Sequence, residues 1–466
     1  MNKPLAILLL RIAGAPDKPS RTYAEKFFTN AGRGTRNLVD YYDEVSHGQI
    51  DLGNSEVFGW MDYGHTVQDL SDAWTKFHDD KKKELLKAGL SEADAEDKAS
   101  GYANGAKRDQ LVAWARTAAA DNQVPVANFQ GIVCVFNQPV DYFGSPGETV
   151  VNWEPKGPPF SVDLTGVAHE VGHNLGLNHS RREGSGDEYG DKWDIMSAYG
   201  VYFDKTGTLT PPGSPYLTFG PGLNAVNMEL AGWLDQTRVY TGTGGWLQLR
   251  PLHRRDLPGW LAARIQVGNN TLYLEFRLKA RWDKKIPDPC ILLHQRAIHP
   301  ADGNPCSEII VANPGAKGGA RTDLREGESY EVGNALNPFD FYVRITVLKI
   351  DVETMEAQLQ INIRQARHFE PGATLFGGVA NDGGGLIWVP GRGFVKVPPR
   401  SPLIAVLQSL AEYEALQSID GGRQGHQLEG LRLERLTAMR DQLSAMIDAR
   451  QERGVPAPVL TGRRGR

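Results

Sequence analysis

The pattern of apolar and polar positions divides the chain into three regions. In residues 1–236, continuous apolar runs predict buried strands, and apolar residues three or four apart predict amphipathic helices. The expected strands are 4–13, Gln49–Leu52, Glu56–Trp60 and Gly131–Phe136. The expected helices are Arg36–Ser46, Val67–Ala88, about Gln110–Ala120 and Val162–Leu175, with a polar, solvated segment at Ser91–Lys98. This order predicts a mixed sheet with a helix crossing beneath it.

In residues 237–365 the pattern changes to short alternating runs. Strands are expected at Trp246–Arg250, Leu261–Val267, Thr271–Leu278, Ile291–His294, Phe341–Ile350 and Ala357–Ile363, and such strands with turns between them predict a β-sandwich. Residues 366–466 combine an expected hairpin at Leu386–Val397 with expected helices at Leu403–Ser418 and Leu428–Arg453. The fold class predicted for the chain is α+β, with a C-terminal helical region of unknown role.

The strongest chemical signal is the stretch His169–His179, which reads HEVGHNLGLNH. On a helix, His169 and His173 project from one face and can bind one Zn²⁺, with Glu170 beside them as a general base. Gly176 can adopt the positive φ that ends the helix and brings His179 back as a third ligand. Three protein ligands and an open position are typical of catalytic zinc. The alternative is two buried structural histidines and a surface one.

The segment 180–236 has almost no periodicity, which favours a functional loop such as the lower wall of a cleft. Its acidic residues Asp187, Glu188 and Asp191 could bind Ca²⁺ through carboxylate oxygens, or could simply be solvated. Other residues that could line the cleft are His47, His65 and Asn152–Glu154, whereas Arg296 and His299 are expected at the surface.

Composition and charge narrow the function class further. The 466 residues are 40% hydrophobic and 23% charged, as in an ordinary soluble protein of two or three domains. The net charge of −5 gives no reason to expect nucleic acid as a partner, and no apolar stretch is long enough for a membrane span. The oligomeric state is not predicted.

Two features bear on export. The run Met1–Leu10 has a basic start, but Arg11 interrupts it, so a buried strand is favoured over a signal peptide. Cys290 and Cys306 could form a disulfide in an exported protein or remain two free thiols. Cys134 lies in an apolar strand and is expected to be inert.

The eleven-residue motif resembles that of the metzincin zinc peptidases. The clan's second mark is a methionine in a tight turn below the zinc, and Met196 in Asp194–Ser197 matches it. Three further passages are most similar to the immune-inhibitor-A and gametolysin-like group: Val45–Leu52 with Val57–Trp60, Glu188–Met196, and Leu223–Ala225 with Leu230–Leu234. The resemblance covers about residues 4–236 and, more weakly, the sandwich to about 365.

The resemblance implies a secreted zinc endopeptidase that hydrolyses protein or peptide substrates. Some clan members place a tyrosine two residues after the methionine as a ligand or proton donor; here the tyrosine is Tyr199, three residues after it, and it could serve as that donor or as packing. Two other functions stay open. One is a secreted binding or adhesion protein whose zinc domain is secondary, and the other is a zinc amidase acting on cell-wall peptides.

Overall fold

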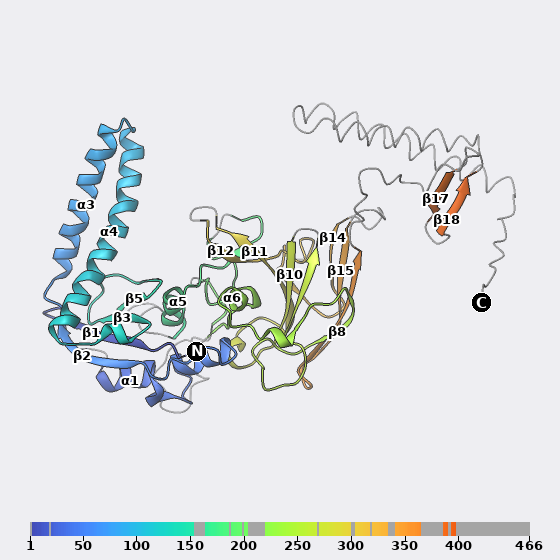
Figure 1. The fold of residues 1–466 in the computed structure, drawn as a ribbon, viewed down its shortest axis with the longest axis horizontal. Helices are drawn as coiled ribbons and strands as arrows, with labels where there is room; N and C mark the ends of the chain where they lie inside the picture. Colours follow the sequence, from blue (N-terminus) through green and yellow to red (C-terminus); the bar gives the residue numbers. More distant parts are fainter. Residues whose placement is uncertain are drawn as a thin grey trace. The chain divides into compact units, whose positions relative to one another are not determined.

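The computed structural model describes residues 2–17, 20–152, 164–185, 188–197, 200–203, 220–267, 270–299, 303–316, 319–333, 341–364, 385–389 and 393–397. The chain divides into two compact units, Met1–Arg367 and His368–Arg466. The fold is a mixture of helices with several sheets (Figure 1), as expected for an α+β protein. Among the described residues, no helix is both long and apolar enough to cross a membrane.

The first sheet has five strands in the order β2-β1-β3-β5-β4. Their bounds are β1 Leu5–Arg11, β2 Glu56–Asp62, β3 Gly131–Phe136, β4 Phe143–Ser145 and β5 Glu148–Asn152. The pairs β1–β2, β1–β3 and β3–β5 are parallel, whereas the edge strand β4 is antiparallel to β5. The strands predicted at 4–13, 56–60 and 131–136 are confirmed. The strand predicted at 49–52 is wrong, because this segment makes one isolated bridge at Asp51.

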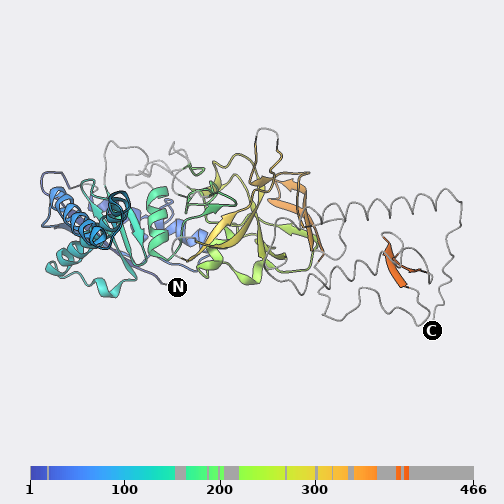
Figure 2. The ribbon, with the colours of Figure 1, turned by 90° about the horizontal axis from the view of Figure 1, so that it is seen from above.

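Both faces of this sheet are buried, because side chains alternate along each strand. Leu5, Ile7 and Leu9 of β1 pack with helices α1 (Arg21–Phe28), α2 (Leu38–Val45), α5 (Leu164–Asn174) and α6 (Ala225–Leu230). Ala6, Leu8 and Leu10 pack with α4 (Glu92–Asp121). We call these the α5 face and the α4 face. Figure 2 shows α5 between the five-stranded sheet and the strands that follow it in the chain.

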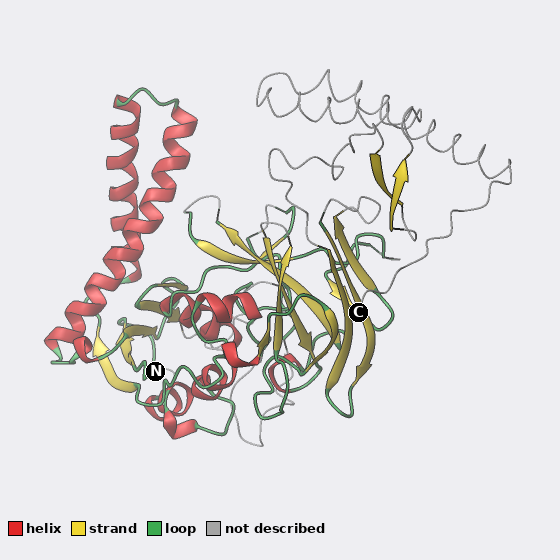
Figure 3. Ribbon diagram, turned by 45° about the vertical axis from the view of Figure 1, so that its right-hand side comes forward, coloured by secondary structure: helices red, strands yellow, loops and turns green. Residues whose placement is uncertain are grey.

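Helices α3 (Val67–Lys87) and α4 form a long antiparallel hairpin that stands away from the sheet (Figures 1 and 3). The helix expected at about 110–120 is therefore too short. Helix α4 begins at Glu92, after the N-cap Ser91, and so includes most of the segment 91–98 that was expected to be solvated. Within that extension Ala95, Ala99 and Ala103 are fully buried. Alanines one turn apart allow two helices to approach closely but give little apolar periodicity, which is why the sequence pattern missed them.

The second region contains two sheets around one core. The seven-stranded sheet has the order β6-β12-β11-β10-β9-β7, with β13 paired to β11, and the four-stranded sheet has the order β14-β15-β16-β8. Residues from both sheets, among them Leu249, Ile265, Leu293 and Ile345, share a core cluster. The bounds are β6 Arg181–Arg182, β7 Val239–Tyr240, β8 Gly245–Leu249, β9 Ala262–Val267, β10 Asn270–Arg277, β11 Cys290–Ile298, β12 Pro305–Ile309, β13 Asp323–Leu324, β14 Ser329–Gly333, β15 Tyr342–Asp351 and β16 Glu356–Arg364.

Strands β8, β9, β10, β11, β15 and β16 match the six predicted strands, whereas β6, β7, β12, β13 and β14 were not predicted. Four 3₁₀ turns complete the described helical elements: Asn30–Gly32, Val126–Asn128, Gln236–Arg238 and Arg281–Asp283. The second unit contains the predicted hairpin, as β17 (Gly385–Val389) and β18 (Gly393–Val397). The helices predicted at 403–418 and 428–453 lie outside the described residues.

One strand connects the first two regions. β6 follows directly on the histidine motif, and it pairs in parallel with β12 at the edge of the seven-stranded sheet. Glu183 continues this pairing, because its backbone N–H donates to the Ile309 carbonyl over 2.9 Å. The division predicted at residue 236 stays a prediction, but the two regions share a sheet across it.

The three cysteines are buried and free. Cys290 is opposite Arg277, whereas Cys306 is opposite Ala297, seven residues further along β11. At about 3.3 Å per residue the two cysteines are roughly 23 Å apart along the sheet, whereas a disulfide needs Cα atoms within about 7 Å. Of the two alternatives for Cys290 and Cys306, two free thiols is the one observed.

A fully buried arginine joins β10 to the first region. The Arg277 guanidinium pairs with Glu275 at 3.0 Å and with Asp283, and its Nη2 also donates to the Trp193 carbonyl over 2.9 Å. Since neither Arg277 nor Glu275 has solvent-exposed side-chain surface, the carboxylates depend on this cation for their charge compensation.

We expect Arg277→Met to lower the free energy of unfolding by about 3–5 kcal/mol, because it leaves buried carboxylates without a counter-charge. The matched control is Arg264→Met. Arg264 pairs with Glu229 at 2.9 Å but is one-third exposed, so its loss should cost about 1 kcal/mol or less. Chemical denaturation measures both, and equal losses would contradict a special role for Arg277.

Candidate metal centre

The local sequence explains how three histidines meet. His169 and His173 lie one turn apart on α5, and Gly176 ends the helix region with φ +95°. The backbone N–H of Gly176 donates to the His173 carbonyl, and that of Leu177 donates to the Gly172 carbonyl. This turn reverses the chain and returns His179 to the face of α5 that carries the other two histidines.

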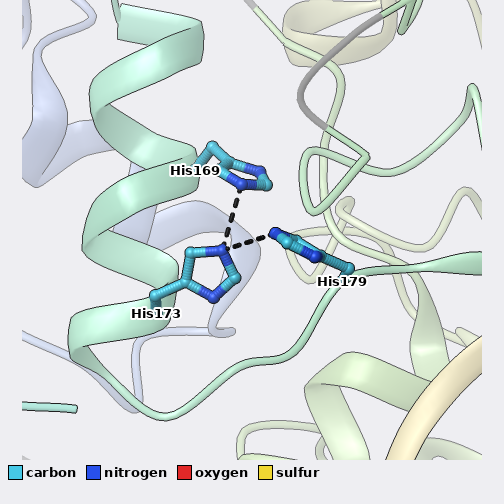
Figure 4. Close-up of side chains that lie close together, drawn as sticks. All are labelled: His169, His173 and His179. Carbon is cyan, nitrogen blue, oxygen red and sulfur yellow. Dashed lines mark hydrogen bonds between the residues drawn. The ribbon is translucent and has the colours of Figure 1, made fainter. Parts of the chain in front are cut away.

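The three imidazoles point their Nε2 atoms at one another (Figure 4). His173 Nε2 lies 3.1 Å from His169 Nε2 and 3.0 Å from His179 Nε2. Tetrahedral zinc with bonds of about 2.0–2.1 Å separates its nitrogen ligands by roughly 3.3 Å. Within the described part of the chain, these three residues form the one group of at least three His, Cys, Asp or Glu able to hold a metal ion.

The opposite ring nitrogens fix the tautomers. His169 Nδ1 faces the Ile195 carbonyl at 2.9 Å, and His173 Nδ1 faces the Leu177 carbonyl at 2.8 Å. Because a carbonyl only accepts, both Nδ1 atoms carry the proton and both Nε2 atoms present a lone pair. Lone pairs this close repel unless a cation lies between them, so the residues fit a metal ion.

Burial also favours the neutral, metal-binding form of these rings. It lowers the pKa of His169 well below its usual value and that of His173 to about 4, in each case with help from a neighbouring histidine. Burial likewise lowers the pKa of His179, although Glu188 acts in the opposite direction. Neutral imidazole is the form that binds metal, and protons therefore compete weakly for these nitrogens near pH 7.

Glu170 is nine-tenths buried beside the triad, against the edge strand β4. Burial raises the pKa of its carboxyl to about 8, whereas Arg108 and a hydrogen bond from the Gly144 backbone act in the opposite direction. A Cβ at Gly144 would lie 2.2 Å from the Glu170 carbonyl oxygen and 2.8 Å from His173 Cβ. Glycine therefore allows β4 to lie directly against α5 at the centre.

The loop that contains Met196 packs against α5 and His169. Met196 is fully buried, and a Cβ at Gly172 would lie 2.5 Å from its Sδ, so this glycine provides its space beside α5. The Met196 carbonyl accepts from the Ser180 backbone N–H over 3.0 Å. The loop thus contacts α5, the residue after His179 and, through the Ile195 carbonyl, His169.

Two buried aspartates hold that loop. Asp194 accepts hydrogen bonds from the Met196 backbone (2.7 Å), the Ser180 hydroxyl (3.0 Å) and the Asn227 amide (3.1 Å). Asp191 lies 2.9 Å from Nε2 of His294, which comes from β11 of the second region. Burial lowers the pKa of His294, but the Glu275 and Asp191 carboxylates outweigh it and raise that pKa above its usual value.

Residues beyond the motif reach the third histidine. Glu188 Oε1 lies 3.4 Å from His179 Nδ1, 3.4 Å from Arg181 Nη2 and 3.3 Å from His299 Nε2. His299 follows β11, and its side chain is 12% exposed, so this expected surface residue is partly buried. In addition, Asn178 Nδ2 donates to the Pro305 carbonyl over 2.9 Å. His299 and Pro305, which flank β11 and β12 of the seven-stranded sheet, therefore border the histidine centre.

Two of the other predicted residues, His47 and His65, are not brought to this centre. His47 is buried and hydrogen-bonds the Leu252 carbonyl, and His65 stacks on Trp114 at 3.7 Å between ring centroids. Arg296 is exposed, as expected. Asp187, Tyr199, Trp153 and Glu154 lie outside the described residues. The described residues do not support the predicted Ca²⁺ site, because Glu188 faces His179 and Asp191 is buried against His294.

One comparison with known proteins, a family model, matches the part of the chain that contains this centre. Residues 88–199 match the model of the family described as metallo-peptidase family M12B, reprolysin-like. This match includes the three histidines, Glu170 and Met196, and it is consistent with a metzincin zinc metallopeptidase, as the sequence resemblance implied. The likeness to the immune-inhibitor-A and gametolysin-like group stays a prediction.

No curated protein matches the chain. Among solved structures, the chain is similar to wild-type OgpA from Akkermansia muciniphila, with 12% sequence identity and a TM-score of 0.26. That similarity covers 78% of this chain and 95% of the other.

We expect Glu188→Gln to weaken zinc binding about tenfold, because a carboxylate next to the Nδ1–H of a liganding histidine orients the ring and raises its basicity. The matched control is Glu183→Gln in the same loop, where Glu183 accepts from the Val311 backbone N–H and an amide oxygen can replace the carboxylate oxygen. Competition with a chromophoric chelator measures both affinities. Equal affinities for the two variants would remove Glu188 from this role.

Proposed function

We propose that the chain is a zinc-dependent endopeptidase of the metzincin type, with His169, His173 and His179 as ligands and Glu170 as general base. The observation that carries this proposal is the convergence of three histidine ring nitrogens within 4.8 Å of one another beside a buried glutamate. A protein that only bound a partner would need no buried carboxyl at this place. The reprolysin-like match supports peptide bonds as the substrate class.

When bound, zinc supplies a Lewis acid that lowers the pKa of a coordinated water and polarises a carbonyl oxygen. The Glu170 carboxylate accepts a proton from the water that attacks the scissile carbonyl. It then delivers this proton to the amine nitrogen as the C–N bond breaks. A carboxyl whose pKa is raised towards neutrality suits both transfers, because it can bind and release a proton near pH 7.

The edge strand β4 is the proposed place for the substrate backbone. It ends the order of the five-stranded sheet, and its Gly144 lies against Glu170 and His173. An extended peptide that added to this edge by main-chain hydrogen bonds would pass directly beside the histidine centre. Residues 152–154 were expected to line the cleft, and in this proposal the substrate pairs with β4 instead.

The remaining assignments follow from the same proposal. Residues 1–236 are the catalytic domain, 237–365 the β-sandwich domain, and 366–466 a region without an assigned role. Met196 is the methionine of the turn below the metal and contributes packing, not chemistry. Tyr199 stays a candidate proton donor.

We expect Glu170→Gln to bind zinc one-to-one and to lower casein hydrolysis by at least about 10²-fold, since the amide cannot accept the proton of the attacking water. A zinc chelator should abolish hydrolysis by the unchanged protein, and zinc should restore it.

His179→Ala should lose most of its metal after dialysis, because only two of the three nitrogen ligands remain to hold it. Full activity of the Glu170 variant, or hydrolysis insensitive to the chelator, would overturn the proposal.

A further inference from the structure

A basic cluster lies at the edge strand, at the middle of helix α4, one turn before Leu111 and Val112 pack on the sheet. Lys107 Nζ lies 2.9 Å from Asp141 Oδ2, and the Arg108 guanidinium lies 3.2 Å from Asp141 Oδ1. The Asp141 side chain is 12% exposed, whereas that of Arg108 is 44% exposed. Two cations share one carboxylate, so the cluster has a net positive charge at the surface.

The Arg108 side chain of this cluster lies against β4. The Arg108 guanidinium carbon lies 4.6 Å from the ring centroid of Phe143, the first residue of β4. Phe143 belongs to the core of the α4 face, whereas the next residue, Gly144, faces Glu170 on the α5 face. Arg108 also acts on the Glu170 carboxyl electrostatically. The basic cluster is therefore one strand position away from the proposed catalytic base, on the opposite face of the strand.

The alternation of side chains along a strand decides which substrate residue could meet this cluster. In a peptide paired with β4, successive side chains point to the α5 face and the α4 face in turn. A side chain on the α4 face lies about 5 Å from its cross-strand neighbour, and so comes within reach of the guanidinium stacked on Phe143. Its two sequence neighbours point away.

We propose that Arg108 and Lys107 form a subsite that binds an acidic side chain of the peptide substrate; this rests on the peptidase function proposed above. The Asp141 carboxylate binds Nε and Nη2 of Arg108, and Nη1 has no acceptor among the described residues. The free edge of the guanidinium and the Lys107 ammonium offer donors that suit a carboxylate. The α3–α4 hairpin thus contributes specificity as well as structure.

The test compares peptides that carry Asp or Glu with peptides that carry Asn or Gln, one position at a time on either side of the cleaved bond. At one peptide position, we expect kcat/KM to be about fivefold higher for the acidic peptide, which is the effect expected of a partly exposed ion pair. At the two adjacent peptide positions we expect no preference. Arg108→Gln should remove the preference. Arg108→Glu should reverse the preference, so that a peptide with Lys at that position is cleaved faster than one with Asp or Glu. A variant that only damaged the structure would not reverse it.

Arg116 provides the matched control. It lies on the same helix, is 45% exposed, and pairs with Glu148 of β5 at 3.0 Å, but β5 is not the edge strand. Arg116→Gln and Arg116→Glu should leave the preference for acidic peptides unchanged.

A second measurement separates this proposal from the peptidase proposal. Fluorescence anisotropy of the same labelled peptides on the zinc-loaded Glu170→Gln protein reports binding without turnover. Cleavage without an acidic preference, or a preference that survives Arg108→Glu, would overturn the subsite alone. Binding selective for acidic peptides and sensitive to Arg108→Glu, with no cleavage by the unchanged protein, would overturn the peptidase alone.

Discussion

The hydrogen bonds of one buried carboxylate, Asp194, hold the histidine centre in place. Asp194 binds the backbone of the Met196 loop and the Ser180 hydroxyl, so the loop below α5 and the residue after His179 are fixed to the same group. Burial and the nearby Asp191 raise the pKa of Asp194 to about 7. Such a group is stable only where its hydrogen bonds are satisfied, and those bonds define the shape of the loop.

Residues of the second region, 237–365, contact the loop that contains Asp194. Arg277, His294 and Glu275 come from its seven-stranded sheet and are fully buried at the junction. Arg277 pairs with Glu275 and Asp283, and His294 pairs with Asp191. Arg277 also donates to the Trp193 carbonyl, and Glu275 accepts from the Ala225 backbone N–H, both in the first region. The catalytic geometry proposed for α5 therefore depends on residues that lie far from the motif in the chain.

The sequence predicted the parts of the fold and site that depend on local patterns. The spacing of His169, His173 and His179 around Gly176 is a property of one helix and one turn, and the buried strands are continuous apolar runs. The contacts that were missed join residues far apart in the sequence: Glu188 and His299 are 111 positions apart, and Asp191 and His294 are 103 apart. Helix α4 was shortened in the prediction because its buried stripe consists of alanines, which carry little hydrophobic signal.

The pairing of β6 with β12 has a consequence for how this protein could evolve. A catalytic domain that ended at residue 236 would carry away a strand that belongs to its neighbour's sheet and would leave β12 with an open edge. Such an edge exposes unpaired N–H and C=O groups and favours aggregation. The two regions are therefore poor candidates for separate exchange between genes, and a recombination event that preserves function has to transfer them together.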